Sequence, residues 1–280
     1  MNQEKIPATV ITGFLGAGKT TMIRNLLQNA GGKKIALIIN EFGDLGVDGD
    51  VLKGCGAENC TEDDIIELTN GCICCTVADD FIPTMTKLLE RDARPDHIVI
   101  ETSGLALPQP LVAAFNWPDI RTHVTVDGVI TVVDSAAVAA GRFADDHDAV
   151  EARRVEDDSL DHESPIEELF EDQLTCADLI VLNKTDLIDG DGLGRVRAEV
   201  ASRTARKPTI IEAKNGDVPA AILLGLGIGT EDDIVNRKSH HELEHEDGTP
   251  HDHDEFDSFV VELGPIADPV AFVDALKGAI

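Results

Sequence analysis

A glycine-rich segment near the N-terminus gives the clearest chemical signal in this 280-residue sequence. Residues 13–20, GFLGAGKT, fit the pattern G-x-x-x-x-G-K-[ST] and stand between an apolar run and a helical pattern. Glycines let backbone N–H groups approach phosphate oxygens, and the helix N-terminus adds partial positive charge. We predict that Lys19 lies against the β- and γ-phosphates of a nucleotide as a catalytic residue, and that the Thr20 hydroxyl holds Mg²⁺. The predicted nucleotide contacts are Gly13, Gly16, Ala17, Gly18, Lys19, Thr20 and Thr21. The alternative is a glycine-rich turn with a chance lysine.

The segment Asn183-Lys184-Thr185-Asp186 predicts which base is bound. A carboxylate at Asp186 can accept hydrogen bonds from N1–H and the exocyclic amine of guanine. Adenine presents an acceptor at N1 and would leave that carboxylate unpaired, which is costly. Behind a phosphate loop, the four residues therefore favour GTP over ATP, with Asn183, Lys184 and Asp186 as nucleotide contacts. Ordinary helix capping by Asn183 and Asp186 is the alternative.

Glu101-Thr102-Ser103-Gly104 follows another apolar run and has the composition of a nucleotide-sensing loop. A carboxylate at Glu101 is placed to hold the hydration shell of Mg²⁺, and the Gly104 N–H can contact a γ-phosphate. We predict a switch here, with Glu101 as a catalytic residue. A simple strand-to-loop cap is the competing interpretation.

Three crowded thiols, Cys72, Cys74 and Cys75, predict a site for a soft metal ion. Thiolates suit Zn²⁺, Co²⁺ or Cu⁺, and three of them leave one position of a tetrahedral site open, which favours transfer over permanent binding. Inert buried cysteines and a redox pair are the alternatives. Cys55 and Cys60 are either further ligands or loop residues, and Cys176, on an apolar helical face, is expected in the core.

Charge and composition exclude several classes of protein. The chain has 23 Lys and Arg against 53 Asp and Glu, a net charge of −30, and 4% aromatic residues. A broad nucleic-acid surface needs a basic footprint, so we predict no nucleic-acid partner. Apolar runs are too short for a membrane helix, and the N-terminus lacks the pattern of a secretory leader, so we expect a cytoplasmic protein.

Short apolar runs alternate with helical patterns along the chain, and most of the runs lack inside/outside alternation. Such strands are buried on both faces, as in a parallel sheet covered by helices. We predict an α/β fold of the P-loop NTPase type, with a doubly wound, mostly parallel sheet. The expected strands are Ala8–Ile11, Ile35–Ile39, Ile65–Leu68, His97–Ile100, Val124–Val133, Leu179–Leu182 and Thr209–Ile211. The expected helices span residues 19–30, 77–91, 166–176 and 193–204.

Acidic stretches interrupt this pattern at residues 145–172 and 231–257. The second holds five histidines among eleven acidic residues and is expected to be a solvated linker. We predict a GTPase domain over residues 1–230, the linker over 231–257, and the start of a second, incomplete domain over 258–280. Within this last part we expect a strand at Phe259–Leu263 and a helix at Asp268–Ala279.

Taken together and in this order, GFLGAGKTT, the segment Asn40–Gly43, GCICC, ETSG and NKTD resemble the CobW-type metal-handling GTPases. The resemblance covers about residues 7–230. Relatives of this type are metallochaperones that bind nucleotide and metal cooperatively and release the metal to a client enzyme upon GTP hydrolysis. The resemblance places the metal ligands on Cys72, Cys74 and Cys75, and makes Glu41 a candidate catalytic residue that couples Mg²⁺ or water to the thiols.

The segments LKGCGAENC, FEDQLTCADLIVLNKTDL and LLGLG most resemble the members associated with aerobic cobalamin biosynthesis. The resemblance then implies Co²⁺ as the transferred metal, cobaltochelatase as the client, and GTP with Mg²⁺ as cofactors. The chain departs from the pattern in stopping early in the second domain, which we interpret as truncation, and in having Ala213-Lys214 beside the expected guanine. No Gln occupies the usual place for orienting the attacking water. The sequence leaves open whether the protein forms a dimer that depends on metal or nucleotide.

Our hypothesis is that GTP and Mg²⁺ order the segments near Glu41 and Glu101 and bring the three thiols into ligand geometry. Metal and nucleotide affinities then depend on one another. Because Zn²⁺ and Cu²⁺ outcompete Co²⁺ at most thiol sites, selectivity must come from geometry, availability or the client. The alternatives are a zinc chaperone or zinc-regulated GTPase, a metal buffer based on residues 231–257, and an assembly GTPase with a structural Zn²⁺.

Overall fold

A computed structural model describes residues 4–40, 65–68, 81–91, 94–144, 150, 165–240 and 243. In this part of the chain, seven parallel strands form one sheet in the order β3-β2-β4-β1-β5-β6-β7. The strands are β1 (Ile6–Thr12), β2 (Ile35–Asn40), β3 (Ile65–Leu68), β4 (His97–Glu101), β5 (Val124–Asp134), β6 (Leu179–Asn183) and β7 (Thr209–Glu212). Each predicted strand is confirmed, and the parallel α/β sheet confirms the predicted fold class.

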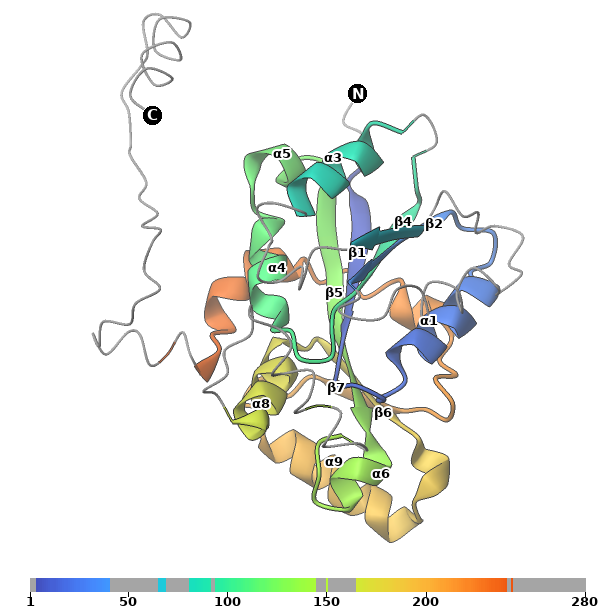
Figure 1. Ribbon diagram of the computed structural model, residues 1–280, viewed down its shortest axis with the longest axis vertical. Helices are drawn as coiled ribbons and strands as arrows, with labels where there is room; N and C mark the ends of the chain where they lie inside the picture. The colour runs from blue at the N-terminus through green and yellow to red at the C-terminus, as the bar shows by residue number, and fades with distance from the viewer. Residues whose placement is uncertain are drawn as a thin grey trace, which may run out of the picture. The chain divides into compact units, whose positions relative to one another are not determined.

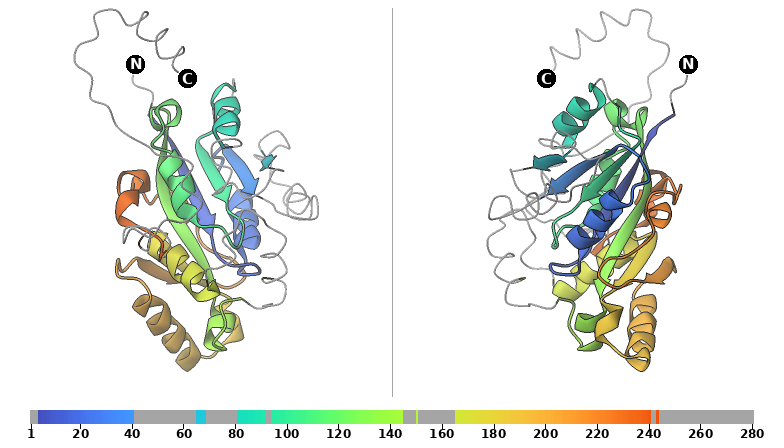
Figure 2. Two further views of the ribbon diagram at one scale, coloured as in Figure 1. Left: turned by 60° about the vertical axis from the view of Figure 1, so that its left-hand side comes forward. Right: turned by 90° about the vertical axis from the view of Figure 1, so that its right-hand side faces the viewer.

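Helices cover both faces of the sheet (Figure 1). The helices are α1 (Lys19–Gln28), α3 (Ile82–Leu89), α4 (Pro108–Ala114), α5 (Pro118–Arg121), α6 (Ser135–Ala139), α8 (Ile166–Cys176), α9 (Gly190–Ser202) and α10 (Ala220–Leu223). Three short 3-10 turns are η3 (Thr185–Leu187), η4 (Thr230–Asp232) and η5 (Ile234–Asn236). Helix α1 packs on one face, while α4 packs on the other together with α3 and α5 (Figures 1 and 2).

Alternate residues of the central strands belong to two different apolar clusters. On β1, Ala8 and Val10 pack with α3 and α4, whereas Ile11 packs with α1. On β4, Ile98 and Ile100 join the first cluster and Val99 joins the second. Burial on both sides explains why these strands are apolar throughout. The sheet is therefore a rigid core whose carboxyl edge can support a site.

The predicted helices agree with the structure to different degrees. Helix α8 has the predicted bounds, and α1 ends two residues before the predicted limit of 30. Helix α9 begins three residues before the predicted start at 193, because the Asp189 side chain accepts from Gly192 N at 2.7 Å and caps it. Of the expected 77–91 helix, α3 supplies Ile82–Leu89, and residues 77–80 lie outside the described residues.

Four short helices, α4, α5, α6 and α10, span four to seven residues each and were not predicted from the sequence. Helices α4 and α5 begin with Pro108 and Pro118, where a missing N–H costs nothing because the first turn has no partner for it. None of the four is long enough to show a helical period. No helix in the described part of the chain is long and apolar enough to cross a membrane.

The chain divides into two compact units, Met1–Leu243 and Glu244–Ile280. The first unit extends past the expected boundary at residue 230. Residues 231–240, expected to be the start of a solvated linker, include Glu231, Arg237 and Ser239 as buried side chains. The second unit, with the expected strand Phe259–Leu263 and helix Asp268–Ala279, lies outside the described residues.

Candidate functional site

The glycine-rich segment connects β1 to α1 at the carboxyl edge of the sheet. Gly13, Gly16 and Gly18 all have positive φ angles, of 134°, 75° and 102°. A β-carbon at Gly13 would collide with the backbone of Val132, and one at Gly18 with the side chain of Asn183. Only glycine therefore fits at these two positions, and the resulting backbone is shaped as a cradle for phosphate.

The ammonium group of Lys19 is held within this loop. Lys19 is the first residue of α1, its side chain is buried, and Nζ donates to Gly13 O at 2.7 Å and Phe14 O at 3.3 Å. The positive end of a helix and a buried ammonium meet at one place, which favours an anion. The predicted contacts Ala17 and Thr21 flank this group in the sequence, with Ala17 buried and Thr21 half-buried.

Thr20 and Glu101 come together although they are far apart in the sequence. Thr20 Oγ1 donates to Glu101 Oε1 at 3.0 Å. Glu101 ends β4, which pairs with β1, so the start of α1 meets the end of the neighbouring strand. Hydroxyl and carboxylate oxygens are the ligands that Mg²⁺ prefers, so this pair fits the ion that accompanies a bound nucleotide. Glu41, the other predicted carboxylate, lies outside the described residues.

The loop after Glu101 lies directly against the phosphate loop. Thr102 N donates to Ile11 O at 3.0 Å, which continues the alignment of β4 with β1. A β-carbon at Gly104 would lie 2.6 Å from Leu15 N, so the two loops touch backbone to backbone. Gly104 is therefore adjacent to the phosphate loop, as a sensor of a terminal phosphate must be.

The Asn183 side chain connects the phosphate loop to the loop that follows β7. Its Nδ2 donates to Ala17 O at 2.9 Å, and its Oδ1 accepts from Gly216 N at 2.9 Å. The side chain is buried at the end of β6. The carboxamide thus joins the phosphate loop to the loop that follows β7, and it positions the next three residues relative to both.

Asp186 lies on η3 with its side chain exposed. Lys184, just before η3, has a φ of 58° and forms an ion pair with Asp134 Oδ2 at 2.6 Å. Thr185 Oγ1 donates to Ala213 O at 2.9 Å, which holds η3 against the Ala213-Lys214 loop. Asp186 makes no hydrogen bond or ion pair with another described residue, so its carboxylate can accept from guanine.

The structure therefore assembles most of the predicted nucleotide residues at one edge of the sheet. The predicted thiol ligands Cys72, Cys74 and Cys75, together with Cys55 and Cys60, lie outside the described residues. Within the described ranges, no three His, Cys, Asp or Glu side chains are grouped to hold a metal ion. The thiol site accordingly stays a prediction.

Two residues of the site were not predicted from the sequence. Asp134, the last residue of β5, caps α6 through Ala136 N and Ala137 N and also pairs with Lys184. Gln173, on α8, donates to Gly104 O and Ala106 O, both at 3.2 Å. The available signals were a carboxylate at the end of an apolar run and a polar residue on an apolar helical face.

Residues 226–240 form a segment, called the strap below, that packs against β5, α4 and α8. The Arg237 guanidinium is fully buried, donates to Cys176 O at 2.7 Å and pairs with Asp178 Oδ1 at 2.7 Å. Thr230 Oγ1 donates to the other oxygen of Asp178 at 2.6 Å. Cys176 is fully buried, which confirms its expected place in the core, and this burial raises the pKa of its thiol to about 12.

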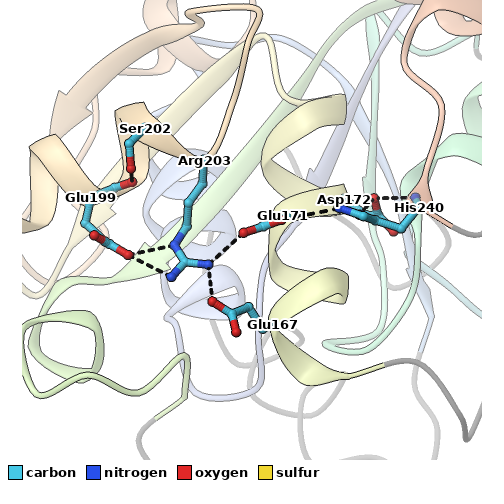
Figure 3. A network of polar contacts seen from close by, with 7 residues as sticks. All are labelled: Glu167, Glu171, Asp172, Glu199, Ser202, Arg203 and His240. Atoms are coloured by element: carbon cyan, nitrogen blue, oxygen red, sulfur yellow. Dashed lines mark hydrogen bonds and ion pairs between the residues drawn. The ribbon is translucent and has the colours of Figure 1, made fainter. Parts of the chain in front are cut away.

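The described strap reaches His240, which contacts α8 (Figure 3). His240 N and Nδ1 donate to Asp172 Oδ1 at 2.9 and 2.8 Å, and Nε2 lies 3.4 Å from Glu171 Oε2. Burial opposes the protonation of His240, but the bond to Asp172 and the charges of Glu171 and Glu168 outweigh it, so the His240 pKa is raised. Burial also raises the pKa of Asp172. His240 is thus held at the surface of α8.

Comparison with known proteins agrees with this geometry. The family model described as CobW/HypB/UreG, nucleotide-binding domain, matches residues 7–212. The chain belongs to this family. The family match covers the phosphate loop, the Glu101–Gly104 loop and the Asn183–Asp186 segment, and it confirms the resemblance to CobW-type GTPases.

Curated relatives of this CobW-family chain are named for zinc. "Zinc chaperone CobW" of Sinorhizobium sp is 86% identical over 279 residues, covering 100% of this chain and 79% of that protein. The protein of the same name in Pseudomonas aeruginosa is 54% identical, over 97% of this chain and 72% of that one. "Zinc-regulated GTPase metalloprotein activator 1" of Schizosaccharomyces pombe is 38% identical over 70% of this chain and 43% of its own length.

Among solved structures, the Zn(II)-bound YjiA GTPase from E. coli has a TM-score of 0.51 to this chain at 24% identity. The match covers 82% of this chain and 63% of that one. At this identity the likeness shows the fold alone. It agrees with the parallel α/β fold described above.

Proposed function

We propose that this chain is a GTP-hydrolysing metallochaperone, in which the nucleotide controls the capture and release of a transition-metal ion. One observation carries the nucleotide half of the proposal: Asn183 Nδ2 donates to Ala17 O at 2.9 Å. This bond joins the segment that selects guanine to the loop that binds phosphate. The metal half is supported by the names of the relatives and by the thiol triplet of the sequence.

The site residues that the structure describes each have a defined part in the proposed hydrolysis. The backbone amides of residues 13–20 and the Lys19 ammonium bind phosphate oxygens, while Asp186 selects guanine. Thr20 and Glu101 would hold Mg²⁺, which when bound neutralises charge on the transferred phosphoryl group. Gly104 N–H contacts the γ-phosphate, so the loop that contains it responds to hydrolysis.

The proposed cargo site is formed by Cys72, Cys74 and Cys75, with Glu41 as the residue that couples it to the nucleotide. Zinc is the cargo that the names of the relatives favour. Thiolate ligands agree with this choice, because Zn²⁺ binds such ligands more tightly than Co²⁺ does. Cobalt, with cobaltochelatase as its client in cobalamin biosynthesis, is the competing proposal suggested by the sequence.

Coupling between metal and nucleotide is the property that makes this protein a chaperone. If GTP raises the affinity for metal by some factor, the metal must raise the affinity for GTP by the same factor. Loss of the γ-phosphate then lowers metal affinity and allows transfer to a client metalloprotein. We propose that this cycle takes place in the cytoplasm.

The test is an equilibrium titration of the full chain with Zn²⁺ and, separately, Co²⁺, in the presence of Mg²⁺ with a non-hydrolysable GTP analogue, with GDP, or without nucleotide. We expect the metal affinity to be at least about tenfold higher with the analogue, a coupling of roughly 1.4 kcal/mol. The variant Cys72→Ser/Cys74→Ser/Cys75→Ser should bind GTP but lose the coupled metal site. Equal metal affinities in all three nucleotide states would refute the chaperone proposal.

Further arms of the same experiment separate the alternatives. In the variant Asp186→Asn, a xanthosine triphosphate analogue should raise the metal affinity in place of the GTP analogue. An amide at this position can pair with the xanthine base, which a carboxylate repels. Deleting residues 244–257 should leave one coupled ion per chain. A metal buffer would instead lose most of its metal on this deletion, and a structural zinc would stay bound with GDP and resist chelators.

A further inference from the structure

Gln173 is buried within the domain and contacts the loop that follows β4. Its exposed fraction is 0%, and Nε2 lies 3.2 Å from both Gly104 O and Ala106 O. The two carbonyl groups stand on either side of Leu105. A carboxamide has two N–H donors, so one side chain can satisfy both carbonyls. Gln173 therefore fixes the backbone of residues 104–106 at two points.

The opposite side of this loop touches the phosphate loop. The Gly104 Cα has no room for a β-carbon, which would lie 2.6 Å from Leu15 N. Leu105 packs in the same apolar cluster as Phe14 and Leu174, from the phosphate loop and from α8. Residues 104–106 are thus held between the phosphate loop and the Gln173 carboxamide.

Helix α8 is itself anchored at the turn that carries Gln173. Thr131 Oγ1, on β5, donates to Gln173 O at 2.8 Å. Gln109 Nε2, on α4, donates to Asp172 O at 3.1 Å. The helix is therefore fixed to the sheet and to α4. Because Gln173 is part of this fixed helix, its side chain can hold residues 104–106 in place.

We propose that Gln173 is a positioning residue for the nucleotide reaction, which holds Gly104 where its N–H can meet a γ-phosphate. The inference rests on the proposed hydrolysis of GTP and assigns a role to a residue that lies in the segment FEDQLTCADLIVLNKTDL but belongs neither to the phosphate loop nor to NKTD. Gln173 contacts the carbonyl groups of Gly104 and Ala106, so it would act on the nucleotide through this loop. Preorganised donors stabilise developing charge because they need no rearrangement during the reaction, and the two hydrogen bonds supply that order.

The predicted effect is selective for the triphosphate. GDP has no γ-phosphate, so its affinity does not depend on the position of Gly104 N–H. Loss of the two Gln173 hydrogen bonds should weaken binding of a GTP analogue about tenfold relative to GDP, equivalent to about 1.4 kcal/mol. A merely structural role for Gln173 would change the affinities for both nucleotides together or leave both unchanged.

The test compares Gln173→Met with Asn116→Leu in the full chain. Each change keeps the approximate size of the side chain and removes its donors. Asn116 Nδ2 also donates to a backbone carbonyl, Glu231 O at 2.7 Å, but Asn116 contacts neither α8 nor residues 104–106 through this bond. We expect Gln173→Met to lower the ratio of GTP-analogue to GDP affinity about tenfold and to slow single-turnover hydrolysis by a similar factor. Asn116→Leu should leave the ratio unchanged.

An unchanged ratio in a folded Gln173→Met variant would overturn the inference while leaving the proposed GTPase intact. A wild-type chain that neither binds nor hydrolyses GTP would instead overturn the proposed function and, with it, this role. If Gln173→Met does not fold, hydrogen exchange of the wild-type Gln173 carboxamide decides. Exchange that is slower with the GTP analogue bound than with GDP bound supports the clamp, and equal rates with the two nucleotides refute it.

Discussion

The carboxylate of Asp134 lies 2.6 Å from the ammonium of Lys184, and the same carboxylate caps α6. The pair joins the ends of β5 and β6, where Asp134 is in register with Asn183. Lys184 has a φ of 58°, a left-handed conformation that residues with a side chain seldom adopt. The ion pair stabilises that conformation and thereby fixes the residue from which η3 and Asp186 begin.

Substitution Asp134→Asn separates the two roles of this carboxylate, which are capping α6 and pairing with Lys184. The amide oxygen can still cap α6, but the charge that holds Lys184 is lost. We expect the affinities for GTP and GDP to fall together about three- to tenfold, equivalent to roughly 1 kcal/mol, because the guanine segment is less fixed. Isothermal titration measures both affinities.

The matched control is Asp189→Asn, which changes another carboxylate that caps a helix, through Gly192 N. No ion pair between Asp189 and a lysine is present among the described residues. This variant should bind nucleotide like the wild type. If Asp134→Asn also binds like the wild type, the ion pair has no part in the site.

The strands could be predicted from the sequence because each is a compact run of β-branched and aliphatic residues. The 3.6-residue period likewise revealed α8 with its observed limits. Helices α4 and α5 were missed because they are short and begin with proline, which marks a turn as readily as a helix. Local pattern therefore determined the sheet and the long helices but not the short connections.

The proposed nucleotide residues could be selected from the sequence because their spacing is local: the phosphate loop and the segment Asn183–Asp186 are each continuous. Gln173 and Asp134 could not, because each acts on residues that only the fold brings close. Residues 231–257 were expected to be a solvated linker because of their charge, and the strap includes residues 231–240. Arg237 is nevertheless fully buried, because its guanidinium pairs with Asp178 and donates to Cys176 O. These partners are about 60 residues away in the sequence, so a local pattern cannot predict them.

Substitution Glu101→Gln tests the proposed magnesium site. The amide oxygen can still accept from Thr20 Oγ1, but the negative charge at the end of β4 is removed. We expect the Mg²⁺ concentration that gives half-maximal hydrolysis to rise about tenfold, since a carboxylate near the ion contributes on the order of 1.4 kcal/mol. GDP affinity measured without Mg²⁺ should change little.

Glu231→Gln is the control for this variant. Glu231 is also a buried glutamate whose Oε1 accepts from a threonine hydroxyl, that of Thr125 at 2.6 Å, but it belongs to the strap. It should lower stability without changing the Mg²⁺ requirement. An equal Mg²⁺ requirement in Glu101→Gln and wild type would argue against this site.

Substitution Asn183→Ala removes the link between the phosphate loop and the loop after β7. Ala17 O and Gly216 N each lose a partner at 2.9 Å, so we expect a loss of about 2–4 kcal/mol in the free energy of unfolding. Nucleotide should also bind at least about tenfold more weakly, because the two loops are no longer held in register. Urea unfolding and nucleotide titration measure the two effects.

Asn116→Ala gives the comparison, since Asn116 Nδ2 donates to Glu231 O at 2.7 Å, in the strap. It should lower stability while nucleotide affinity stays at the wild-type value. A folded Asn183→Ala chain with wild-type nucleotide affinity would show that the link is not needed for the site.

Protonation of His97 should destabilise the domain in mild acid. Thr9 Oγ1 donates its single proton to Leu223 O, so His97 donates from Nε2 to Thr9 at 2.8 Å and its Nδ1 carries no proton. That Nδ1 is buried and has no hydrogen-bond partner in the described structure. Burial lowers the His97 pKa from 6.5 to about 4, while Asp127 opposes the shift and Lys33 adds to it.

Because the unfolded chain takes up this proton more readily, the contribution of His97 to stability is complete above its unfolded pKa of 6.5. It is lost as the pH falls from there towards about 4. Between about pH 7.5 and about pH 5.5 the loss should be on the order of 1.4 kcal/mol. His97→Gln keeps a donor for Thr9 without a titrating ring, so its unfolding free energy should fall less over this interval, by about that amount. His123→Gln, at an exposed histidine, should keep the wild-type pH dependence. Parallel curves for wild type and His97→Gln in urea unfolding would contradict the assignment of a neutral, buried His97.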